Sequence, residues 1–188
     1  MKVETFQDFY HKLLADAFDA ENQLLKALPK MAKAASSEEL RSAFEEHLVQ
    51  TREHASRIER IFEMSDLSPK RAKCKAMVGL IEEGEEVIKE FEAGDLKDAA
   101  LICAAQKVEH YEIAGYGTLK TLASLLEEDD AESLLDETLE EEKETDQKLN
   151  QLSESINPEA LEEEPGESGE PGQRKGTRTS TRGKQRVA

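Results

Sequence analysis

Apolar residues recur every three or four positions over most of residues 1–156, which is the period of an α-helix buried along one side. Four long segments carry this pattern, and a shorter segment, residues 76–92, lies between the second and the third. Amphipathic helices bury their apolar sides by packing against one another. We therefore predict an all-α protein, an antiparallel four-helix bundle with an additional short crossover helix. The long helices are expected at residues 6–35, 40–64, 96–126 and 127–156.

The composition changes at Asn157. Residues 157–188 contain three prolines, five glycines and few large apolar side chains, a composition that cannot bury a core. We predict a bundle domain at residues 1–156 and a disordered Pro/Gly/charged tail at residues 157–188. The tail carries six acidic and six basic residues, so the whole net charge of −17 lies on the bundle.

This acidic charge excludes some partners. The bundle should repel nucleic acid and anionic membranes. We expect the tail to be inert and solubilising. The alternative is that its basic end, from Gln173 onward, contacts an anionic partner such as nucleic acid. No apolar run approaches the roughly 20 residues that a membrane span needs, and the N-terminal sequence does not have the pattern of a signal peptide. We expect a cytoplasmic protein.

Charged and polar residues interrupt the apolar sides of all four long segments. An unpaired carboxylate is costly to bury, so it persists in a core only where another group neutralises it. One such polar residue lies near the middle of each predicted helix. In an up-and-down bundle, the midpoints of the helices lie at similar height. The central residues are Glu21, His54, Glu112 and Glu142, with Glu109 and Asp146 beside them.

Carboxylates and a histidine that converge in the middle of a bundle are typical of di-iron and di-manganese proteins. Hard divalent ions favour carboxylate oxygen, and imidazole suits iron as well. One alternative is a metal-free polar network whose hydrogen bonds fix the register of the helices, and another is a wrong assignment of the buried faces. We expect His47 to be a core or rim histidine, because it lies two turns from His54. His110 should face away from the site, and Glu141 should be solvated.

Several segments resemble the YciF-like proteins of the ferritin superfamily. The resemblance is most specific in residues 99–119, extends to 19–24, 79–83 and 140–149, and covers about residues 4–156. It implies a rubrerythrin-like bundle with an extra helix, a homodimer and an association with stress responses. Carried over by position, the implied metal ligands are Glu21, His54, Glu109, Glu112, Glu142 and Asp146.

We therefore expect a ferritin-like di-metal carboxylate protein that binds two iron or manganese ions. The resemblance implies that it handles iron with oxygen or peroxide, as a ferroxidase or peroxidase-type oxidoreductase does. Gln50, one turn before His54, stands where we expect relatives to have glutamate, and its neutral amide predicts an asymmetric, weakened or absent metal pair. The alternative function is a metal-free helical scaffold that acts by dimerisation or partner binding.

Overall fold

The computed structural model describes residues 3–65, 67 and 72–162. Within these residues it contains five helices and no strand, which confirms the all-helical prediction. No helix in the described part of the chain is long and apolar enough to cross a membrane. The helices are α1 (Phe6–Ala34), α2 (Glu38–Met64), α3 (Lys75–Glu90), α4 (Asp95–Leu125) and α5 (Asp129–Glu162).

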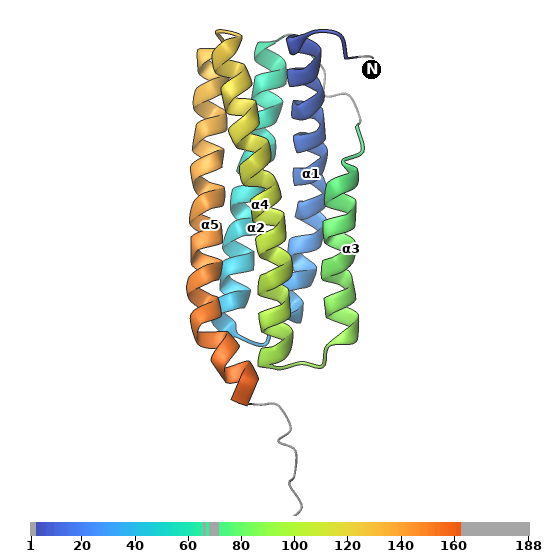
Figure 1. The fold of residues 1–188 in the computed structure, drawn as a ribbon, viewed down its shortest axis with the longest axis vertical. Coiled ribbons are helices and arrows are strands. Elements are labelled where there is room, and N and C mark those ends of the chain that lie inside the picture. The colour runs from blue at the N-terminus through green and yellow to red at the C-terminus, as the bar shows by residue number, and fades with distance from the viewer. Residues whose placement is uncertain (1–2, 66, 68–71, 163–188) are drawn as a thin grey trace, which may run out of the picture.

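The four long helices lie side by side, and the shorter α3 packs on the outside against α1 and α4 (Figure 1). Helix α1 also packs against α2 and α4, and α5 packs against α2 and α4. Helix α3 carries the chain back along the length of the molecule, so that α4 runs in the same direction as α2 (Figure 1). Each long helix therefore presents one side to the common core.

Capping side chains fix where the first two helices begin. Thr5 and Asp8 form a capping box at α1, in which Thr5 Oγ1 accepts from Asp8 N at 3.0 Å and Asp8 Oδ2 accepts from Thr5 N at 3.1 Å. Ser37 caps α2, and the buried carboxylate of Asp98 on α4 accepts hydrogen bonds from the backbone N–H groups of Ser36 and Ser37. Asp98 thereby ties the turn between α1 and α2 to the start of α4.

Helix α5 continues to Glu162, past the end that we predicted at Ile156. Pro158 lies inside this last part, where it removes one backbone donor and bends the helix without ending it (Figure 1). Ala160 is buried beyond the proline, so packing holds the extra residues in the helix. The rest of the predicted tail, residues 163–188, lies outside the described residues, and its disorder stays a prediction.

Candidate metal centre

Buried polar side chains gather between two apolar clusters of the core. On α1, Leu14 belongs to one cluster and Leu24 to the other, and Glu21 lies between them with only 1% of its surface exposed. The other long helices also carry buried polar residues between members of the two clusters. The buried polar set is Glu21, His47, Thr51, His54, Glu109, Glu112, Thr138 and Glu142.

Glu21, His54 and Glu142 form a first group, in which one ligand atom from each side chain lies within 4.8 Å of the others. The Nδ1 atom of His54 is 3.0 Å from Glu142 Oε1 and 3.8 Å from Glu21 Oε1. The hydroxyl of Tyr116 donates a hydrogen bond to Glu21 Oε1, while Glu21 Oε2 has no hydrogen-bond partner among the described residues. Helices α1, α2 and α5 thus each contribute one ligand-type side chain to this group.

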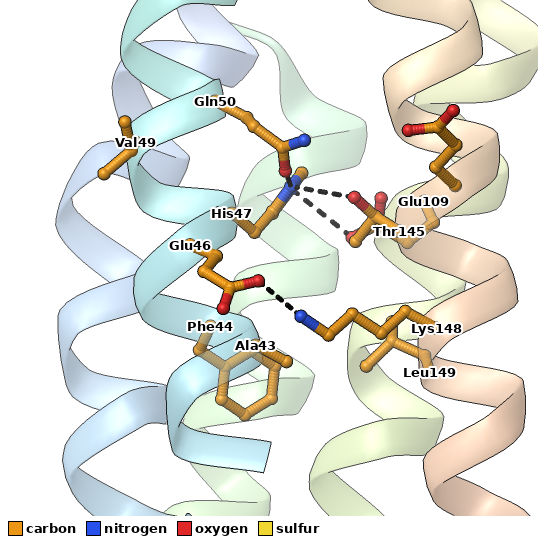
Figure 2. Close-up of a pocket in the computed structure, with 11 residues that line it drawn as sticks. Ala43, Phe44, Glu46, His47, Val49, Gln50, Glu109, Thr145, Lys148 and Leu149 are labelled. Carbon is orange, nitrogen blue, oxygen red and sulfur yellow. Dashed lines mark hydrogen bonds and ion pairs between the residues drawn. The ribbon is translucent and has the colours of Figure 1, made fainter. Parts of the chain in front are cut away.

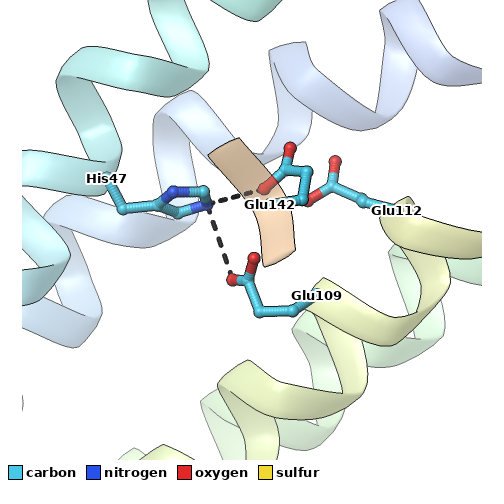
Figure 3. Close-up of side chains that lie close together, drawn as sticks. All are labelled: His47, Glu109, Glu112 and Glu142. Carbon is cyan, nitrogen blue, oxygen red and sulfur yellow. Dashed lines mark ion pairs between the residues drawn. The ribbon is translucent and has the colours of Figure 1, made fainter. Parts of the chain in front are cut away.

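His47, Glu109, Glu112 and Glu142 form a second group (Figure 3). The Nε2 atom of His47 is 3.5 Å from Glu109 Oε1 and 3.8 Å from Glu142 Oε2. Within the described part of the chain, neither oxygen of Glu112 accepts a hydrogen bond. Glu142 belongs to both groups, with Oε1 towards His54 and Oε2 towards His47, so its carboxylate joins the two groups.

The imidazole of His54 is oriented by an ion pair on its outer side. Its Nε2 atom is 2.8 Å from Glu141 Oε2, and Arg57 donates to Glu141 Oε1 at 3.0 Å. A partner on the outer nitrogen holds the ring so that Nδ1 faces Glu142, as outer carboxylates do for metal-binding histidines. The expectation that Glu141 is solvated was wrong, because its side chain is only 26% exposed and fills this supporting role.

His47 belongs to the second group, so its assignment as a core or rim histidine was incomplete. Two helical turns separate its backbone from that of His54 by about 10 Å, but their ring centroids approach to 6.2 Å. His47 Nδ1 contacts Gln50 Oε1 at 3.4 Å and Thr145 Oγ1 at 3.3 Å, so Nε2 faces the carboxylates. The sequence signal was present, since residues seven apart on a helix share one face.

The remaining candidates lie away from both groups. Asp146 Oδ1 is 3.4 Å from Nε2 of the exposed His110, and the Asp146 side chain is 18% exposed. Asp146 is therefore a residue at the edge of the centre, unlike the predicted ligands Glu21, His54, Glu109, Glu112 and Glu142, which the structure brings together. Gln50 contacts His47 and belongs to neither group, so its side chain acts on the orientation of an imidazole.

Burial raises the pKa of three of the four glutamates. The pKa values of Glu109 and Glu112 lie well above the usual range of a carboxyl, first because of burial and then because of neighbouring carboxylates. Burial also raises the pKa of Glu21 to about 8, although the charge of His54 opposes the shift. In the absence of a cation, Glu21 therefore retains its proton at neutral pH.

The pKa values of the fourth glutamate, Glu142, and of the two histidines are set by their charged neighbours as well as by burial. Burial acts against ionisation of Glu142, but His54 and His47 outweigh it and hold the Glu142 pKa below its usual range. Burial also opposes protonation of His54, but Glu142, Glu21 and Glu141 raise its pKa to about 9. The pKa of His47 is lowered, chiefly by burial. A His54–Glu142 ion pair is thus the main internal compensation of charge.

The donor set fits divalent cations. Buried carboxylate oxygens with no hydrogen-bond partner are expensive to ionise. Within the described ranges, the two groups contain several such oxygens within reach of one another. Carboxylate oxygens suit magnesium, calcium and manganese, and imidazole suits zinc, copper, iron and nickel. A cation held by these side chains would replace the protons of the carboxyl groups whose pKa is raised. It would also give their oxygens the partner that they lack.

The fold and this centre define an all-helical protein with a buried carboxylate–histidine cluster that is suited to metal. Residues 5–162 match the family described as "Domain of unknown function (DUF892)", and the chain belongs to this family. It is 53% identical over 154 residues to Protein YciF of Escherichia coli (strain K12). The aligned region covers 81% of this chain and 93% of that protein. The resemblance to YciF-like proteins is therefore confirmed.

Solved structures support the same relationship. The crystal structure of the E. coli stress protein YciF superposes with a TM-score of 0.81 at 52% identity and covers 83% of this chain and 99% of that one. YcfI from Rhodopseudomonas palustris, for which a structural role is suggested, has a TM-score of 0.77 at 38% identity over 79% and 95% of the two chains. A protein from Xanthomonas campestris pv. campestris shares the fold alone, with a TM-score of 0.68 at 21% identity over 84% and 97%.

Proposed function

We propose that this chain is a ferritin-like di-metal carboxylate protein that binds two iron or manganese ions and handles iron with oxygen or peroxide in a stress response. The observation that carries the proposal is the pair of ligand groups that share Glu142. Carboxylate and histidine side chains that project from four long helices into one central site are the plan of di-iron and di-manganese proteins. The E. coli relative is described as a stress protein, which is in line with this role.

The centre departs from the general plan in a way that its neighbours compensate. That plan places Glu-x-x-His on each of two helices, but Thr51 stands three residues before His54, and Thr145 stands three residues after Glu142. Both threonine hydroxyls bond to backbone carbonyls of their own helices. The missing carboxylate and imidazole are matched by Glu109 on α4 and His47 on α2, which complete the second group.

Bound iron or manganese would supply electron transfer to oxygen or peroxide, and the protein supplies the surroundings. The hydroxyl of Tyr116 holds Glu21 in place, and the Arg57–Glu141 pair fixes His54. Apolar clusters lie on both sides of the polar layer, and the low-polarity surroundings that they provide strengthen the charge interactions inside it. Glu21 and His54 would give up their protons when a cation binds.

Elemental analysis of the protein purified without chelator tests the proposal. We expect about two metal ions per chain, and we expect Glu112→Ala to reduce this content and to lower the melting temperature of the loaded protein, because a lost ligand removes the stabilisation that binding provides. His110→Ala is the matched control, since His110 lies on the same helix with its side chain 70% exposed. Unchanged metal content and unchanged melting in Glu112→Ala would show that the site is assigned wrongly.

A substitution at Gln50 separates this proposal from a metal-free scaffold. Gln50→Glu places a carboxylate on His47 Nδ1, where it would fix Nε2 towards Glu109 and make the ring a better ligand. We expect metal affinity to rise by up to about tenfold and the loaded variant to be at least as stable as the wild type. The metal-free variant should melt lower, because a further negative charge lies beside buried carboxyls.

Isothermal titration with Mn²⁺ and thermal melts of both forms measure these effects. Gln106→Glu on α4 is the control, because Gln106 bonds to Asn150 and belongs to neither ligand group. A Gln50→Glu variant that binds no metal and melts lower with every metal added would favour the scaffold, which acts by dimerisation or partner binding. We also propose that the chain forms a homodimer and is cytoplasmic. Sedimentation of the metal-loaded chain tests the homodimer.

A further inference from the structure

A pocket of about 450 Å³ opens on the face between α2 and α5 and ends at the second ligand group (Figure 2). His47 and Glu109 line its inner end, although only 3% and 2% of their surfaces are exposed. Both carry a buried atom that has no hydrogen-bond partner among the residues that the structure describes, Nε2 of His47 and Oε2 of Glu109. Glu21, His54 and Glu142 do not line this pocket, so it reaches the centre from the side of the second group.

We propose that this pocket is the entry route for hydrated divalent cations, and that they reach the His47–Glu109 side of the centre first. This inference rests on the proposed metal-binding function. At about 30 Å³ for each water, an ion with six waters occupies roughly 180 Å³, and the pocket is large enough for it. Gln50 and Thr145 line the walls and offer an amide and a hydroxyl to the water shell.

A second opening near the centre does not offer this room. It lies between α1 and α4, reaches Glu112, and has a volume of about 60 Å³. Its walls include Leu13, Ala17 and Leu119. That volume corresponds to about two waters, so an ion would have to lose most of its water shell before it met a ligand.

The charges at the mouth make the route testable. Glu46 on α2 and Lys148 on α5 form an ion pair across the pocket (Figure 2), and their side chains are 63% and 44% exposed. Glu144 adds a further acidic group to the lining. A cation that passes here feels the charge of residue 148 at close range, whereas a cation that enters elsewhere feels it only through solvent, where salt screens it.

The experiment follows the uptake of Co²⁺ by the metal-free protein with stopped-flow visible absorption. We expect Lys148→Glu to raise the association rate about fivefold at low salt, and Glu46→Lys to lower it by a similar factor. Both differences should vanish at about 1 M salt, where the Debye length falls to roughly 3 Å. The final amplitude should stay unchanged, because neither residue belongs to a ligand group.

The controls are Lys107→Glu and Glu83→Lys, which alter a similarly exposed ion pair between α3 and α4 by the same charge. If the Lys148 variant and the Lys107 variant speed uptake equally, the route is wrong, although the metal centre stands. If the wild type takes up no Co²⁺, the metal centre itself fails and the route falls with it. Faster uptake in Lys148→Glu alone, with slower uptake in Glu46→Lys alone, establishes the α2–α5 entry.

Discussion

Glu142→Ala should remove metal from both positions at once, so that the metal content falls from about two ions per chain to nearly none. Glu142 is the residue that the two ligand groups share, and it is fully buried. His47 belongs only to the second group, so His47→Ala should lose one ion and keep the other. The comparison therefore distinguishes a pair of joined positions from two independent ones.

Metal content of both variants is measured by plasma mass spectrometry after loading with Mn²⁺ and gel filtration. Glu140→Ala is the control on the same helix, because the side chain of Glu140 is 61% exposed and pairs with Lys143. A chain in which Glu142→Ala and His47→Ala lose the same amount of metal would contradict a bridging role for Glu142. Retention of two ions in Glu142→Ala would exclude the centre altogether.

Raising the pH from 6 to 9 should lower the stability of the metal-free protein and raise its affinity for metal. The folded pKa of Glu21 is about 8, above that of an unfolded glutamate, and the folded pKa of His54 is about 9, above that of an unfolded histidine. Both groups hold protons more tightly when the chain is folded, so their contribution to stability is lost as the pH rises through these values. The metal-free protein should therefore melt lower at pH 9 than at pH 6.

Metal binding offsets this loss of stability, because a cation must displace the same protons from Glu21 and His54. Affinity for Mn²⁺ should rise by about tenfold per pH unit for each proton released and level off above about pH 9. Melting curves should show a loss of roughly 3 °C or more for the metal-free protein over this range, since about 1 kcal/mol shifts the melting temperature by roughly 2–4 °C. Proton release is measured directly by titration in buffers of different ionisation enthalpy. A metal affinity that does not change with pH would contradict the role of Glu21 and His54 as ligands.

The sequence by itself determined the helices and which side of each is buried. The period of the apolar residues predicted five helices near their observed positions, and the capping residues Thr5 and Ser37 stand where the structure begins α1 and α2. A carboxylate in the middle of an apolar stripe also has few physical explanations, so Glu21, Glu112 and Glu142 could be selected from the sequence alone. Their convergence followed from the equal height of helix midpoints.

Only the tertiary structure decided which neighbours join them. The buried side of a helix is wide enough to hold several polar residues. The rotation and axial shift of the packed helices determine which of these residues face the centre. His47 reaches the second group and Asp146 stays at its edge for this reason. Glu141 looked solvated on its own helix, but the approach of α2 gave it His54 and Arg57 as partners. The extension of α5 beyond Ile156 likewise depends on the burial of Ala160 against the rest of the fold, which overrides the break that Pro158 predicts from local sequence.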